Sequence, residues 1–109
     1  MKLTPSEWEI INHRLGAPDA IAECLVGSEG FYYSHEQTVD RAMAIESPDD
    51  IDWSSELDRE IIQDCCLGCT LFGDMEDAVA LGEVTKGWAM AMHKAAKSLE
   101  VKTGAMVTR

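Results

Sequence analysis

The chain has 109 residues, a formal net charge of −11 and a hydrophobic share of 46%, values that favour one compact domain and exclude wholesale disorder or two domains. No apolar run approaches the roughly 18 residues that cross a bilayer, and the N-terminal residues lack the apolar core of a secretory signal. We therefore expect a cytoplasmic protein that makes no contact with a membrane.

Capping patterns predict where the first three helices begin. Thr4-Pro5-Ser6-Glu7 combines an N-cap threonine, a proline in the first turn and a glutamate three residues after the cap, and it predicts a helix that ends at Gly16. A short second helix is expected to open at Pro18. Ser34-His35-Glu36-Gln37 repeats the capping pattern and predicts a third helix that extends to about Glu46.

Three more helices are expected in the second half of the chain. Turn chemistry at residues 47–50 precedes a fourth helix, which should start after Trp53 and fray near Gly68. A short fifth helix is predicted at 74–81. The longest helix should follow at 85–104 and end at its glycine.

These elements predict an all-α fold, a compact single-domain bundle of five or six helices over residues 1–104, followed by a flexible C-terminal tail at 105–109. No segment shows the alternating pattern of a strand. The core should draw on the apolar stripe of each helix. The predicted core residues are Trp8, Ile11, Leu15, Ile21, Leu25, Val39, Met43, Leu57, Ile61, Cys65, Leu81, Trp88, Met92 and Leu99.

Charge is divided unevenly along the chain. Residues 1–83 hold four basic and 19 acidic residues, a balance of −15, whereas residues 84–109 hold five basic residues and one acidic residue, a balance of +4. Within the acidic part, residues 45–83 contain 12 carboxylates and a single arginine. Such a body repels free nucleic acid, so nucleic acid is disfavoured as its partner.

The acidic stretch contains the candidate partner-binding surface. Three aspartates cluster before the fourth helix, and three carboxylates recur every four residues at its start and within it, so they are expected to line one helical face. Like charges at this spacing weaken a helix slightly, and binding to a basic partner would explain them. A solvated face that only maintains solubility explains them equally well. The candidate residues are Asp49, Asp50, Asp52, Glu56, Glu60 and Asp64.

The basic last helix suggests two other functions. Together with the helix at 74–81 it partly matches a helix-turn-helix, although the recognition helix would expose Met90 where a base-reading Arg, Asn or Gln is usual. It can also dock on the acidic body of a second copy. The alternatives are thus a DNA-binding regulator and a self-associating structural or assembly protein, both acting through Lys86, Lys94, Lys97 and Lys102.

The cysteines and histidines offer little for chemistry. Cys66 and Cys69 have a spacing that suits a zinc ion or a redox disulfide, but no second ligand pair accompanies them. The simpler interpretation is that Cys65 and Cys69 are buried apolar residues on one helical face. The three histidines are dispersed, and no nucleophile or phosphate-loop motif is present. We therefore expect no catalytic residue, no metal, no cofactor and no enzymatic activity.

Two segments of the second half resemble small uncharacterised proteins encoded by bacteriophages and prophages. They are LDREIIQDC at 57–65 and DAVALGE at 77–83, the latter with the Lys/Ala-rich helix that follows. The resemblance implies a context in which small acidic proteins inhibit or modulate host systems, as anti-CRISPR proteins and other DNA mimics do. The leading hypothesis is a non-enzymatic acidic protein that binds a host protein, such as one that itself binds nucleic acid.

Overall fold

The residues described by the computed structural model, 2–65 and 76–107, form helices joined by short turns. They contain no strand, so the predicted all-α fold is confirmed. The Cα radius of gyration is 13.6 Å, close to the roughly 13 Å expected for a compact domain of this length.

The first half of the chain forms helices α1 (Pro5–Leu15), α2 (Pro18–Leu25) and α3 (His35–Ala44). Both predicted capping boxes are present. At α1 the Thr4 hydroxyl accepts from the Glu7 N–H at 3.2 Å, and the Glu7 carboxylate accepts from the Thr4 N–H at 2.8 Å. The equivalent pair of bonds at α3 measures 3.1 and 2.9 Å. These local hydrogen bonds satisfy backbone donors that a helix start otherwise leaves open.

The second half begins with a 3-10 turn at Pro48–Asp50, which leads to α4 (Glu56–Asp64). A short helical stretch at 76–80 ends at Gly82. The Gly82 N–H bonds to the Val79 carbonyl and the Glu83 N–H to the Ala78 carbonyl. This closure requires the left-handed φ of +76° that Gly82 adopts. The predicted stop at Gly82 is therefore confirmed.

Helix α6 spans Lys86–Val107 and is longer than predicted. Gly104 does not end it, so residues 105–107, assigned above to a flexible tail, are helical. A glycine inside a helix costs only about 1 kcal/mol relative to alanine, which packing of the preceding turn can offset. Leu99 and Thr103 provide that packing, since both are buried and the Thr103 hydroxyl donates to the Leu99 carbonyl.

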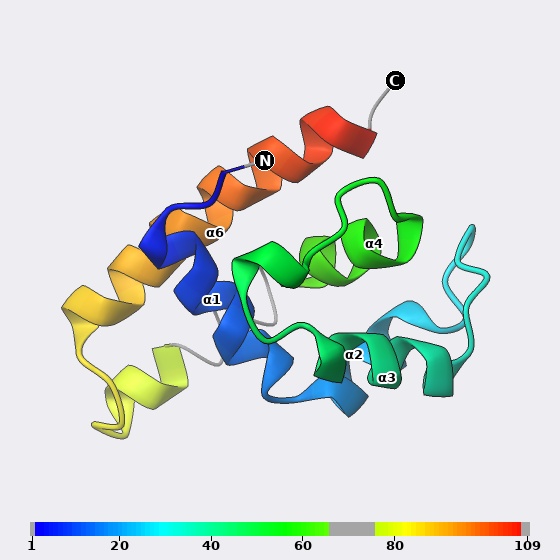
Figure 1. Cartoon of the computed structure of the whole chain (residues 1–109). Coiled ribbons are helices and arrows are strands. Elements are labelled where there is room, and N and C mark those ends of the chain that lie inside the picture. The colour runs from blue at the N-terminus through cyan, green and yellow to red at the C-terminus, as the bar shows by residue number, and fades with distance from the viewer. Residues whose placement is uncertain (1, 66–75, 108–109) are drawn as a thin grey trace.

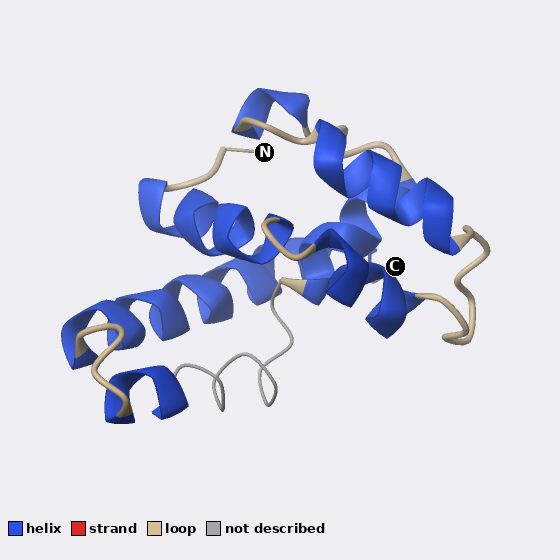
Figure 2. Cartoon of the chain, turned by 90° about the horizontal axis from the view of Figure 1, so that it is seen from below, coloured by secondary structure: helices blue, strands red, loops and turns tan. Residues whose placement is uncertain are grey.

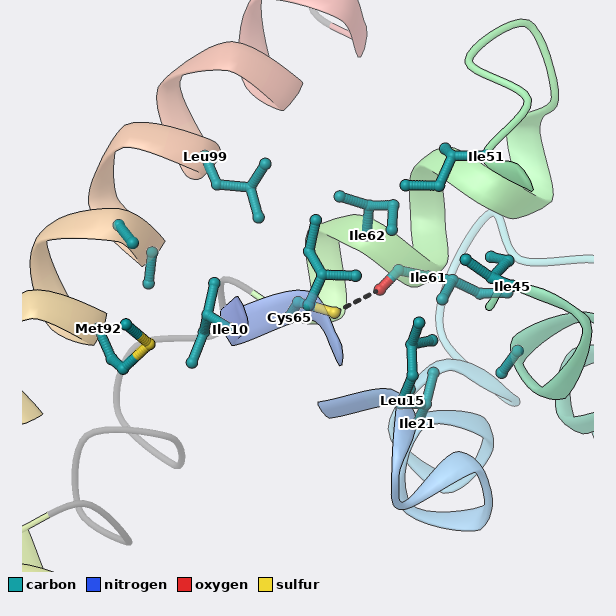
Figure 3. Packing of buried hydrophobic residues seen from close by; sticks show 14 of the residues in the cluster. Ile10, Leu15, Ile21, Ile45, Ile51, Ile61, Ile62, Cys65, Met92 and Leu99 are labelled. Atoms are coloured by element: carbon teal, nitrogen blue, oxygen red, sulfur yellow. Dashed lines mark hydrogen bonds between the residues drawn. The ribbon is translucent and has the colours of Figure 1, made fainter. Parts of the chain in front are cut away.

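Helix α4 lies between α6 and the pair α2 and α3 (Figure 1), and Figure 2 shows the described helices from below, with no strand among them. Helix α4 packs against α6 on one side and against α2 and α3 on the other, while α1 packs along α6 and α2 along α3. The close view in Figure 3 shows the consequence: Ile61 and Ile62 of α4, with Cys65 at its C-terminal cap, lie between Leu99 of α6 and the side chains of Leu15, Ile21 and Ile45.

The core confirms most of the predicted apolar stripes and corrects three positions, of which Val39 is only partly buried and lies outside the core cluster. Met43 is 63% exposed and Leu81 is 75% exposed, so neither belongs to the core. Helix α3 instead buries Thr38 and Ala42, which turns the neighbouring Met43 to solvent. Four isoleucines outside the predicted set also belong to the core, two of them in the segments that flank the 3-10 turn: Ile10, Ile45, Ile51 and Ile62.

Leu99 gives a direct test of this packing. The Leu99 side chain is fully buried where α6 packs against the rest of the core. Leu99→Ala should therefore lower the free energy of unfolding by about 2–5 kcal/mol in a urea titration. Val101, on the same helix but 73% exposed, provides the matched control, and Val101→Ala should change stability by no more than about 0.5 kcal/mol. Equal losses in the two variants would contradict the orientation of α6.

Candidate functional site

One buried carboxylate, that of Asp58, organises the acidic segment that precedes α4. Asp58 is 1% exposed and accepts hydrogen bonds from Arg41 Nε at 2.7 Å, from Arg41 Nη2 at 2.8 Å and from the Asp52 N–H at 2.7 Å. Arg41 Nη2 also donates to the Asp50 carbonyl. The hydrogen bonds with Asp58 raise the pKa of Arg41. A two-pronged ion pair therefore ties α3 to α4 and holds the intervening loop between them.

Two exposed aspartates of this segment are also fixed by local hydrogen bonds. The Asp50 carboxylate accepts from the N–H groups of Glu46 at 2.9 Å and Ser47 at 3.0 Å, and the Glu46 bond is the main reason that the pKa of Asp50 is lowered. Asp52 accepts from the hydroxyl and the N–H of Ser54, and these bonds likewise lower its pKa. Both side chains are thus held as ionised acceptors with defined positions.

The exposed carboxylates of this segment form what we call the acidic surface. Glu60, predicted to belong to it, is only half-exposed and lies at its margin. Burial raises the pKa of Glu60, and repulsion from Glu56, one turn earlier, raises it further. This is the like-charge penalty that the spacing predicts. The acidic surface comprises Glu46, Asp49, Asp50, Asp52 and Glu56.

Asp64 does not belong to this surface, so its predicted place there is wrong. Its side chain is 0% exposed and lies 2.9 Å from Arg14 Nη2 of α1. Burial raises the pKa of Asp64, although Arg14 and a hydrogen bond with the Cys24 thiol oppose that rise. The reason is helical geometry: each step of four residues overshoots a full turn, so eight residues after Glu56 the row has rotated by about 80° towards α1.

Lys102 is likewise removed from the predicted set of free lysines on the last helix. Its Nζ lies 2.6 Å from the Glu7 carboxylate, which is buried and also accepts from the Ser98 hydroxyl at 3.1 Å. Burial alone would raise the pKa of Glu7, but the hydrogen bonds from Lys102, the Thr4 N–H and Ser98 outweigh it and lower the pKa. Lys102 is therefore engaged within the fold, three residues beyond the buried Leu99.

The other predicted lysines of α6 are exposed and share one side of the helix with exposed apolar residues. Met90 is 63% exposed, as predicted, and Val101 is 73% exposed. At 100° per residue, all five positions fall within an arc of about 80°. We call this side of α6 the basic face: Lys86, Met90, Lys94, Lys97 and Val101.

Sequence reasoning did not single out the residues that hold the site together. Asp58, Glu7 and Arg14 lie on largely apolar helical faces, Asp58 three residues before Ile61 and Glu7 four before Ile11. A charge in such a position must find a partner when it is buried. That position was a usable signal of burial, but it does not reveal which distant residue supplies the partner.

In the described part of the chain the cysteine thiols form no metal-binding group with neighbouring side chains. Cys65 is buried, as predicted, and its Sγ bonds to the Ile61 carbonyl at 3.5 Å (Figure 3). Cys66 and Cys69, the candidate zinc or redox pair, lie outside the described residues. Among residues 2–65 and 76–107, no three His, Cys, Asp or Glu side chains are grouped to hold a metal ion.

No protein-family model, curated protein or solved structure matches this chain. An inference about its function therefore rests on the geometry and charge of its own residues. No helix within the described ranges is both long enough and apolar enough to span a bilayer.

The Arg41–Asp58 pair predicts a strong asymmetry between a buried and an exposed aspartate. Asp58→Ala leaves Arg41 without its partner and the Asp52 N–H without an acceptor, so it should lower the free energy of unfolding by about 3 kcal/mol. Asp49→Ala, on the exposed 3-10 turn, should cost no more than about 0.5 kcal/mol. Chemical denaturation measures both, and a small loss for Asp58→Ala would refute the organising role of the pair.

The Arg14–Asp64 pair predicts a pH-dependent effect of substitution. Since the pKa of Asp64 is raised in the folded state, its contribution to stability declines as pH rises above the ordinary carboxyl range. Arg14→Met removes the opposing cation and raises the pKa of Asp64 further, so its cost should grow as pH rises past the already raised pKa of Asp64 in the wild type, by up to about 1.4 kcal/mol per pH unit. Urea titrations at several pH values measure it. In an Asp64→Asn background the same substitution should show no such growth.

Proposed function

We propose that this protein is a non-enzymatic interaction protein whose acidic surface binds a basic site on another protein. The partner that fits best is a protein that binds nucleic acid, because its own phosphate-binding site already presents the complementary charge. In a phage-derived setting, which the sequence resemblance suggests, that partner would belong to the host, and occupation of the site would inhibit or modulate it.

The observation that carries this proposal is the rigid presentation of the acidic surface. The ion pair between Arg41 and Asp58 fixes the loop between α3 and α4. The carboxylates of Asp50 and Asp52 are held by hydrogen bonds from that same loop. Side chains that are already ordered lose less conformational entropy on binding, so such a surface pays less for association than a mobile acidic loop. A surface that only maintained solubility would not require this order.

Charge state also favours binding over proton transfer. A general acid or base works best with a pKa near the operating pH, whereas the pKa values of Asp50 and Asp52 are lowered. Their carboxylates therefore stay ionised at neutral pH and serve as permanent acceptors for lysine and arginine. The same negative charge steers a basic partner towards the surface and repels free duplex DNA.

The test of this proposal compares two double charge reversals with the same change in net charge. Asp49→Lys with Glu56→Lys alters the acidic surface, while Glu23→Lys with Glu29→Lys alters exposed carboxylates of α2 and the turn after it. We expect the wild type and the second variant to retain the same basic partner in affinity capture from host lysate, and the first variant to lose at least about tenfold in affinity for it.

A second arm checks the kind of site that is occupied. Duplex DNA, added to the purified complex at moderate salt, should displace the wild-type protein from its partner if both compete for one basic site. Thermal unfolding of each variant controls for folding. Retention of the partner by the Asp49→Lys, Glu56→Lys variant at unchanged affinity would refute the proposed surface, and a complex indifferent to DNA would refute the proposed class of partner.

A further inference from the structure

The basic face of α6 is an exposed surface that the proposed function does not use. Met92, Ala95, Ala96 and Leu99 bury the opposite side of the helix, against α1 and α4. Along the basic face the exposed side chain of Met90 lies between Lys86 and Lys94, and that of Val101 follows Lys97. A face of this composition offers apolar contact area surrounded by cations.

The lysines of this face have no acidic partner within the described part of the chain. The ion pairs that lysine and arginine form in this part of the chain use other residues, namely Arg14, Arg41 and Lys102. Lys86, Lys94 and Lys97 form none. Lysines without an acidic partner among residues 2–65 and 76–107 leave their charges available to a surface of opposite sign, in a chain with 20 acidic residues and nine lysine and arginine residues.

We infer that the basic face of one copy binds the acidic surface of a second copy, head to tail. The two surfaces are complementary in sign, and together they present five exposed carboxylates opposite three exposed lysines. They belong to different elements: the basic face lies opposite the side of α6 that is buried against α1 and α4, whereas the acidic surface lies in the loop and first turn that begin α4. A single copy therefore does not close the contact on itself.

A contact of this kind uses two different surfaces, so each assembly keeps one acidic surface free at one end and one basic face free at the other. Association should therefore continue beyond a dimer into short chains, unless the rotation between copies closes a ring. Because the inference does not depend on any host partner, it stands or falls separately from the proposed function. It does predict that assembly and partner binding exclude each other, since both occupy the acidic surface.

Duplex DNA is the competing occupant of the basic face. The lysines alone would suit the phosphates of DNA. Residues 1–83, however, carry a charge balance of −15, which repels a duplex and attracts a basic surface. A second copy offers a few carboxylates in place of a long phosphate backbone. The lysines of its own basic face also offset part of the negative charge of its body. The charge distribution thus favours a second copy of the chain.

The first experiment measures self-association of the full chain by sedimentation velocity as a function of salt. At low ionic strength the wild type should form dimers and longer species, and these should dissociate as the screening length falls from about 30 Å at 0.01 M to about 3 Å at 1 M. Lys94→Glu with Lys97→Glu should weaken association about tenfold or more. Lys94→Glu alone should weaken it clearly more than Lys2→Glu, an exposed substitution with the same charge change.

The second experiment distinguishes a head-to-tail contact from any symmetric one. Neither Lys94→Glu with Lys97→Glu nor Asp49→Lys with Glu56→Lys should associate alone. Mixed together, they should associate again, because the first retains the acidic surface and the second retains the basic face. A symmetric contact between two α6 helices would leave the Asp49→Lys, Glu56→Lys variant able to associate by itself, because its α6 is unchanged.

Three outcomes would overturn the inference: a wild-type monomer at low salt and high concentration, association that persists at high salt, or no recovery on mixing the two variants. The face would be assigned to DNA if a monomeric wild type shifted the gel mobility of duplex DNA in a salt-sensitive way and Lys94→Glu with Lys97→Glu abolished that shift. Loss of self-association with retained capture of a basic host protein would leave the proposed function intact.

Discussion

The structure depends on the pairing of carboxylates that the fold removes from water. Each buried ion pair joins residues far apart in the sequence and fixes one helix against another, α1 against α6, α3 against α4 and α1 against α4. An unpaired charge in these positions would cost several kcal/mol, which is a large part of the stability of a small domain. The three pairs are Glu7–Lys102, Arg41–Asp58 and Arg14–Asp64.

These pairs also determine what the outer surface looks like. They consume three of the nine lysine and arginine residues, so most of the exposed carboxylates have no cation nearby and remain as a negative field. The remaining lysines of α6 are left on the side that faces away from the bundle. The charges that these pairs leave unpaired, already separated along the sequence, form the acidic surface and the basic face on which both proposals rest.

Local rules predicted much of this fold because they act over a few residues. The capping boxes at Thr4 and Ser34 and the stop at Gly82 were readable, since each depends on hydrogen bonds within one turn. The end of α6 was not, because Gly104 is overridden by packing of the preceding turn. In the candidate site, Asp49 and Glu56 lie where their sequence context predicts, in a polar loop and a first helical turn.

The sequence by itself determined the all-α class, the starts of the helices and the separation of negative from positive charge along the chain. Only the tertiary structure decided which charges reach solvent. Asp64 and Glu56 look alike in the sequence, yet the rotation of the helix turns Asp64 onto Arg14 of α1. Lys102 and Lys97 differ in the same way, because Lys102 meets Glu7 at a separation of 95 residues. Such partners are brought together by packing, which no local pattern encodes.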